Sequence, residues 1–153
     1  MQLCRLPASP LGTLTPAAAL MRRVYDFSMA VARTGFVSLD CADPLALGTF
    51  WAAMLGGEIR FASATTVGVR TDWVWLAALK VPDYVAPTWP DGGVPKQIHL
   101  DLAVTELEVA VAEAERLGAR VAAVQPAPDR WRVLLDPAGH PFCLTTQIPL
   151  EAR

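Results

Sequence analysis

The sequence lacks three features that would place the protein in a well-marked class. Its hydrophobic runs fall short of the roughly 18 residues that a membrane-spanning helix needs, so we expect no membrane partner. It has no excess of basic residues: the formal net charge is −2 and the pI is about 5.6, which argues against an electrostatic nucleic-acid surface. Its three cysteines are odd in number and form no CxxC motif, and the simplest interpretation is a reduced, cytoplasmic protein.

The chain of 153 residues is 53% apolar, which is enough material for one domain with a sizeable core. Three prolines interrupt residues 1–33, and we expect these residues to form a loosely ordered N-terminal extension that adds little to the core. Two explanations stay open, a natural extension or a start codon assigned too early, before Met29. We assign one domain to residues 34–148, with a first module at about 34–80, a linker at 81–95 and a second module at about 96–148.

The stretch Gln97–Val104, with the sequence QIHLDLAV, shows the alternation of a half-buried strand. One face is aliphatic, whereas the other carries His99 and Asp101, which are costly to bury unless they are paired or face a wet cavity. Thr105 and Glu108 follow at the spacing of a capping box, which predicts a helix with Thr105 as its N-cap.

The same unit of a strand and a capped helix occurs once more upstream. Residues Gly35–Ala42 alternate in the same way and place Ser38 and Asp40 on the polar face. Asp43 is the predicted N-cap of the helix that follows, and Gly56 is the residue that ends it. The interval from cap to closing glycine is the same in both units, so chance is a poor explanation of the match.

Three short strand-like segments follow each predicted helix, and turn residues such as those of the stretch DPAG separate them. A linker rich in proline and glycine divides the two sets. The predicted order is therefore βαβββ, linker, βαβββ, an α+β fold with the helices on one side of a curved sheet. The predicted segments are residues 58–62, 66–70 and 73–80 in the first set and residues 120–124, 130–135 and 141–147 in the second.

Four stretches carry a family resemblance: LDCADPLALGTFWAAMLGGEI, TWPDGG, IHLDLAVTELEVAVAEAERLGARV and VLLDPAGHPFCLTT. Together they resemble the vicinal oxygen chelate superfamily, and within it the glyoxalase-like branch of glyoxalase, bleomycin resistance and dioxygenase proteins. The resemblance covers about residues 34–146 and implies two tandem βαβββ modules that form a curved mixed sheet around a cleft. The superfamily includes isomerases, extradiol dioxygenases, epimerases, thiol transferases and antibiotic-binding proteins, so the fold does not settle the reaction.

The resemblance also implies where a metal would bind. In metal-using members, His, Gln or Glu side chains on the first and last strands of the modules hold a divalent ion. Carried over, these positions fall on His99 and Cys143 in the second module, and on Ser38 or Phe36 in the first; residues 73–81 offer no His, Glu or Gln. Oxygen-preferring ions want several hard ligands, and a zinc site would have only two here, so we expect no metal and no other cofactor.

The polar face of each strand defines the candidate binding site. Trp73 and Trp75 share a face of their predicted strand and would offer aromatic surface to a flat ligand. His99 either contacts the ligand or is satisfied by a carboxylate or a backbone carbonyl, and His140 is expected to face solvent from its turn. The candidate residues of the cleft are Ser38, Asp40, Trp73, Trp75, His99, Asp101, Arg132, Cys143 and Thr145.

Three functions compete on these grounds. The leading hypothesis is a glyoxalase-like protein that binds a small, partly aromatic molecule in its cleft without a metal, with its catalytic residues unassigned. The first alternative is a divalent-metal-dependent lyase, isomerase or dioxygenase. The second is a structural or regulatory dimer without catalysis. Whether the protein is an enzyme, and whether it is a homodimer, are questions that the sequence leaves open; the expected partner is a small-molecule ligand.

Overall fold

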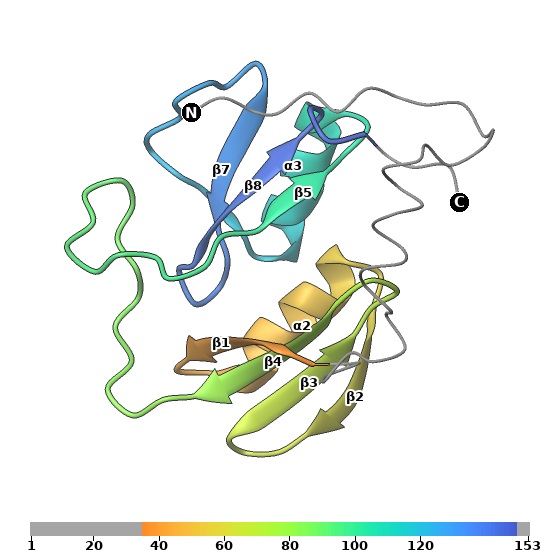
Figure 1. The fold of residues 1–153 in the computed structure, drawn as a ribbon, viewed down its shortest axis with the longest axis vertical. Helices are drawn as coiled ribbons and strands as arrows, with labels where there is room; N and C mark the ends of the chain where they lie inside the picture. The colour runs from red at the N-terminus through yellow and green to blue at the C-terminus, as the bar shows by residue number, and fades with distance from the viewer. Residues whose placement is uncertain (1–34, 150–153) are drawn as a thin grey trace, which may run out of the picture. The chain divides into compact units, whose positions relative to one another are not determined.

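The described part of the chain, residues 35–149 of this computed structural model, repeats one order of elements twice (Figure 1). The predicted βαβββ duplication and the α+β class are therefore confirmed, whereas the extension predicted for residues 1–33 lies outside the described residues. The first module contains β1 (Val37–Cys41), α2 (Pro44–Met54), β2 (Glu58–Ala62), β3 (Thr66–Arg70) and β4 (Trp75–Lys80). The second contains β5 (Asp101–Ala103), α3 (Leu107–Leu117), β6 (Arg120–Val121), β7 (Trp131–Leu135) and β8 (Pro141–Thr145).

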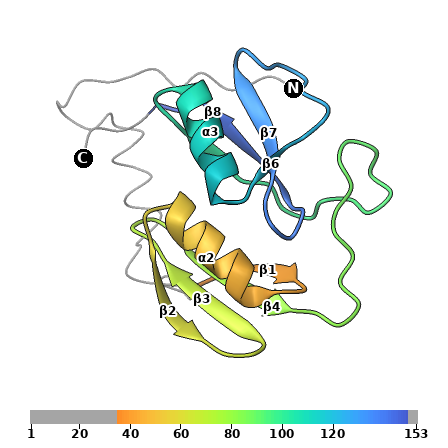
Figure 2. The same ribbon diagram turned by 180° about the vertical axis from the view of Figure 1, so that it is seen from behind.

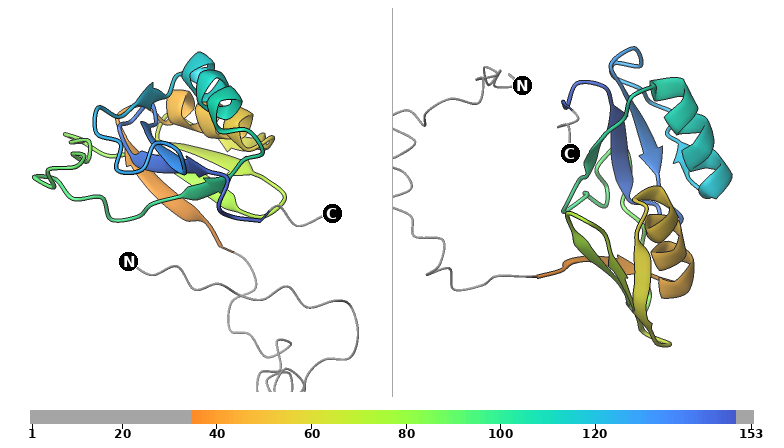
Figure 3. Two further views of the ribbon diagram at one scale, coloured as in Figure 1. Left: turned by 90° about the horizontal axis from the view of Figure 1, so that it is seen from above. Right: turned by 90° about the vertical axis from the view of Figure 1, so that its right-hand side faces the viewer.

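Each module forms its own mixed sheet. The strand orders are β1-β4-β3-β2 and β5-β8-β7-β6, and in both the first strand pairs in parallel with the last while the other pairs are antiparallel. Both helices lie on the same side of the strands (Figure 2), and a side view separates a helix layer from a strand layer (Figure 3, right). Each sheet therefore has one face under a helix and one face turned away from it.

Helix α2 begins as its sequence predicts. The carboxylate of Asp43 accepts hydrogen bonds from the amides of Leu45 and Ala46, both at 3.0 Å, and Pro44 occupies the first turn. The chain leaves the helix through Gly56 at φ +61°, a left-handed conformation that glycine adopts without a steric penalty.

Helix α3 begins one residue later than the capping-box pattern predicts. Its N-cap is Glu106, which makes no side-chain capping hydrogen bond, so the assignment of Thr105 as the N-cap is wrong. The carboxylate of Glu108 pairs with the guanidinium of Arg132 on β7 instead of reaching back to the helix start. The ion pair between Glu108 and Arg132 of β7 therefore takes the place of the predicted capping box.

The strand predicted over Gln97–Val104 is shorter than expected, since β5 covers only Asp101–Ala103. His99 consequently lies just before the strand. Leu102 is buried in the core, as the alternation predicts, but Ile98 is 48% exposed, so its place on the buried face was predicted wrongly.

One hydrophobic core joins the helix-facing sides of the two modules. Trp51 of α2 and Phe142 of β8 are both nearly inaccessible, and their ring centroids are 5.2 Å apart. The same cluster includes Leu39 of the first sheet and Val111 of α3. The first helix therefore packs on side chains of the second module as well as its own.

A buried polar network reinforces this junction. The carboxylate of Asp136, in the β7–β8 turn, accepts hydrogen bonds from Trp51 Nε1 at 3.1 Å and from the amides of Ala138 and His140 at 2.9 Å. His140 Nδ1 lies 2.9 Å from the same carboxylate, and Nε2 lies 3.1 Å from the hydroxyl of Tyr84 in the linker. The expectation that His140 faces solvent is therefore wrong, because its ring is held between a carboxylate and a phenol.

None of the helices within residues 35–149 is both long enough and apolar enough to cross a membrane.

Candidate functional site

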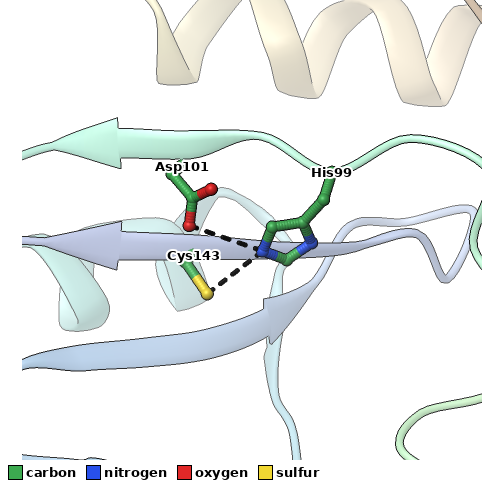
Figure 4. A group of neighbouring side chains, drawn as sticks. All are labelled: His99, Asp101 and Cys143. Atoms are coloured by element: carbon green, nitrogen blue, oxygen red, sulfur yellow. Dashed lines mark hydrogen bonds and ion pairs between the residues drawn. The ribbon is translucent and has the colours of Figure 1, made fainter. Parts of the chain in front are cut away.

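Three polar side chains meet on the face of the second sheet that is turned away from α3, and we call them the His99 group: His99, Asp101 and Cys143 (Figure 4). Asp101 and Cys143 are register partners on β5 and β8, so they share a face, and His99 precedes Asp101 by two residues. Nε2 of His99 is 3.2 Å from Sγ of Cys143 and 3.7 Å from Oδ1 of Asp101. The grouping follows the alternation of side chains along the strands, which is the pattern that predicted it.

Burial sets the protonation of the group. It lowers the pKa of His99 from its ordinary value, against the opposing charge of Asp101, so the imidazole is neutral at pH 7. Burial, followed by the charge of Asp101, raises the pKa of Cys143 to about 12, so the sulfur keeps its proton. The Nδ1 atom of His99 is buried and makes no hydrogen bond of good geometry among the described residues, although the backbone of Pro141 acts on the ring and raises its pKa slightly against the effect of burial. The group is therefore a neutral imidazole and a neutral thiol beside a carboxylate.

This geometry does not make Cys143 a nucleophile. An activated cysteine needs a stabilised thiolate and a histidine whose second nitrogen is oriented by a third group. Here Asp101 approaches the same Nε2 that faces the thiol, and Nδ1 is left without an orienting partner. The group is better suited to hold a ligand through hydrogen bonds than to attack one.

The donor types bear directly on metal binding. Sequence reasoning counted only His99 and Cys143 as zinc ligands in this module, and the structure adds a carboxylate oxygen of Asp101, with the three donor atoms within 4.8 Å of one another. Nitrogen, sulfur and oxygen from three side chains are a set that zinc accepts, whereas Mg²⁺ and Ca²⁺ prefer oxygen alone. Zinc would have to displace the proton of a thiol whose pKa is about 12. The three residues thus fit zinc in number and type, but zinc binding would require the thiol of Cys143 to lose its proton.

Apolar and aromatic side chains surround the His99 group. The buried Ala122, Val133 and Cys143 form a small cluster against which Trp89 and Trp131 pack. Sequence reasoning missed both tryptophans as parts of this face. For Trp131 a signal existed, because it pairs with Thr145 across the strands and so shares the parity of Cys143; Trp89 comes from the linker, where no periodicity could place it.

Thr145 and Arg132 lie on opposite faces of this sheet. Thr145 shares the face of the His99 group, but it is buried and its hydroxyl donates to the carbonyl of Arg130 at 3.1 Å. Arg132 pairs in register with Leu144, whose side chain is in the helix-side core, and its guanidinium pairs with Glu108 of α3. The structure therefore does not bring Arg132 to the His99 group.

Of the candidates from the first module, Ser38, Asp40 and Trp75 lie on the other sheet, whereas Trp73 lines a cavity together with Asp101. Ser38 and Asp40 are exposed on β1, on the face away from α2, and no hydrogen bond or ion pair found within residues 35–149 joins them to His99. Trp75 shares their face. Trp73 does not, because β4 begins at Trp75 and Trp73 is 59% exposed in the preceding turn. The prediction that the two tryptophans share a strand face is wrong.

Trp75 belongs instead to an aromatic group on the outer face of the first sheet, which is the face turned away from α2. Its ring centroid is 5.1 Å from that of Phe36, which is 6.1 Å from that of Phe61. The Phe61 ring lies directly over Gly68, where a Cβ would come within 2.2 Å of it. The guanidinium carbon of Arg70 is 5.8 Å from the Trp75 ring centroid, within cation–π range.

Tandem βαβββ modules with these strand orders define the fold class of the vicinal oxygen chelate superfamily. Within it, the chain belongs to the family described as Glyoxalase-like domain, whose model matches residues 36–145. Among curated proteins, no significant match to the sequence is found.

Solved structures share the fold across most of the chain. The bleomycin-binding protein of Streptomyces verticillus, complexed with copper(II)-bleomycin, is 21% identical with a TM-score of 0.52, covering 78% of this chain and 100% of that one. A mutant of the fosfomycin resistance protein FosX of Listeria monocytogenes, complexed with Mn(II) and 1S,2S-dihydroxypropylphosphonic acid, is 14% identical with a TM-score of 0.58, covering 78% and 93%. A glyoxalase/bleomycin resistance protein/dioxygenase family enzyme of Burkholderia phytofirmans is 17% identical with a TM-score of 0.55, covering 74% and 97%. At these identities the likeness establishes the fold alone.

Proposed function

We propose that the protein binds a small, partly aromatic molecule at the His99 group, without a metal. The observation that carries the proposal is the convergence of three polar side chains beside two tryptophans on one sheet face. Small-molecule sites combine apolar and aromatic walls with a few polar groups that fix orientation. The unpartnered Nδ1 of His99 adds support, because buried polar atoms are normally hydrogen-bonded.

The chemistry of the group favours a ligand held without a metal. The thiol of Cys143 keeps its proton at neutral pH. In the first module, the positions that correspond to metal ligands are Ser38 or Phe36 and a position on the last strand, β4, and none of them carries a His, Gln or Glu side chain. Neutral His99 can donate or accept one hydrogen bond according to its tautomer, and Asp101 accepts. Fold neighbours named for binding bleomycin or for fosfomycin resistance make small-molecule binding a reasonable role for this fold.

The test is a screen of planar aromatic compounds by thermal shift, followed by calorimetry on the compounds that raise the melting temperature. His99→Ala should weaken binding by about tenfold or more, the factor for loss of one hydrogen bond to a ligand, and should shift the melting temperature little. Ser38→Ala is the matched control, since it removes a polar group from the other sheet. Unchanged affinity in His99→Ala, or unfolding of that variant, would place the site elsewhere.

A second candidate is a zinc-dependent relative, which the three converging donors favour. When bound, zinc would supply Lewis-acid chemistry, and His99, Asp101 and Cys143 would hold it. Cobalt substitution tests this without an activity assay: a thiolate-to-cobalt absorption band that disappears in Cys143→Ser would establish the candidate. A titration that gives no such band would remove it.

The cellular location and the oligomeric state of the protein are also proposals. The cysteines within residues 35–149, Cys41 and Cys143, are free and buried, which supports a reducing, cytoplasmic setting. A homodimer is testable by sedimentation velocity on the full chain.

A further inference from the structure

The linker between the modules contains a loop that is closed by its own hydrogen bonds, residues 88–94. The amide of Thr88 donates to the carbonyl of Val94 at 2.8 Å, and the amide of Val94 donates to Oγ1 of Thr88 at 3.0 Å. The loop therefore keeps its shape without pairing to either sheet. It carries Trp89, whose side chain is turned to the second module.

Trp89 packs on the face that holds the His99 group. Its ring contacts the cluster of Ala122, Val133 and Cys143, and its Nε1 donates to the carbonyl of Val124 at 3.3 Å. Cys143, which touches His99, is only 6% exposed. A residue of the linker thus packs against the cluster that contains this thiol.

Lys96, two residues after the loop, interacts with the Trp89 ring. Its Nζ lies 6.0 Å from the centroid of the Trp89 ring, within cation–π range. Its charge also acts on both His99 and Cys143, lowering the pKa of each.

We propose that residues 88–94 form a lid over the His99 group, and that the Trp89 ring decides which molecules reach it. The contacts that hold the ring down are apolar packing and one long hydrogen bond, which open far more easily than a strand pair. Planar aromatic molecules are the class admitted, because they can replace the indole on the apolar surface or stack against it. The proposal rests on the proposed function in taking the His99 group as the ligand site.

Access to the Cys143 thiol measures the lid without any ligand. In the full chain with Cys4→Ser, the thiols that remain are Cys41 and Cys143. The aromatic disulfide dithiobis(nitrobenzoic acid) reacts when a cysteine sulfur loses its proton to solvent and attacks one reagent sulfur. A mixed disulfide forms and the other half leaves as a coloured thiolate, and peptide mass spectrometry assigns the label to each cysteine.

Trp89→Ala should raise the labelling rate of Cys143 by about tenfold or more, because the closed state no longer shields the sulfur. Cys41 is an internal control: it has no exposed surface and lies in the helix-side core, so its rate should not change. Val85→Ala is the matched variant, since Val85 belongs to the same linker but is 65% exposed, and both rates should stay at the wild-type value.

A second variant keeps the test decisive if Trp89→Ala folds poorly. Thr88→Val removes the oxygen that accepts from the Val94 amide while it keeps the indole, and should accelerate Cys143 labelling by a smaller factor. Unchanged Cys143 rates in both variants, or equal acceleration of Cys41 and Cys143, would overturn the lid. Because no ligand is present, that outcome is distinct from a failure of the proposed function, which the affinity of His99→Ala decides.

Discussion

Replacing Trp51 with Phe should lower the free energy of unfolding by about 2 kcal/mol, the usual cost of taking one donor from a buried charged acceptor. Nε1 of Trp51 donates to Oδ2 of Asp136 at 3.1 Å, and Asp136 has no exposed surface. A phenyl ring at the same position retains contact with Phe142, whose centroid is 5.2 Å from that of Trp51. Most of the loss should therefore come from the hydrogen bond, with a smaller part from the reduced ring volume.

Urea unfolding followed by far-ultraviolet circular dichroism measures this change without depending on tryptophan fluorescence. A double-mutant cycle with Asp136→Asn isolates the pair, and the expected coupling is about 1–3 kcal/mol. Trp75→Phe is the matched control, because Trp75 lies on the outer face against Phe36 and should cost less than about 1 kcal/mol. If Trp51→Phe costs as much in the Asp136→Asn background as in the wild type, the bond carries no stability and the reasoning fails.

Two further predictions concern the helix caps and the pH dependence of stability. Asp43→Ala should cost about 1 kcal/mol because two amides lose their acceptor, whereas Thr105→Ala should stay within about 0.5 kcal/mol; chemical denaturation of both variants would reveal an error if Thr105→Ala proved the costlier. Burial holds the pKa of folded His99 below the ordinary 6.5, so its contribution to stability is present above pH 6.5 and is lost as the pH falls towards the folded-state pKa. His99→Gln should therefore flatten the acid side of the stability–pH curve, and a curve identical to that of the wild type would contradict the neutral, buried imidazole.

Local patterns predicted the parts of the fold that local chemistry determines. The Asp43 cap, the closing Gly56 and the strand segments follow from spacing within a few residues. Strand parity also brought Asp101 and Cys143 together, because a shared face needs only the register of a parallel pair. The N-cap of α3 was predicted wrongly because Glu108 forms a long-range ion pair with Arg132 of β7 instead of a local capping bond.

Several features that sequence reasoning missed depend on contacts between distant segments. His140 looked exposed because its neighbours in the turn are polar or small, and only the fold brings Tyr84 from the linker to it. The linker showed no periodicity, so nothing indicated that Trp89 would pack on the second sheet. The sequence alone did not show which face of the sheet Arg132 occupies; its register with Leu144 places it on the helix side.

Native mass spectrometry of the freshly purified full chain, with the wild type beside His99→Ala, tests the central claim most directly, because one spectrum reports metal and retained ligand together. Binding of a small aromatic molecule at the His99 group without a metal predicts that the wild type carries an organic adduct, or takes one up from a panel of planar aromatic compounds. The adduct should be absent from His99→Ala, and neither protein should carry the mass of a metal ion. One equivalent of zinc on the wild type that is lost in His99→Ala would contradict that account and make His99, Asp101 and Cys143 a metal centre.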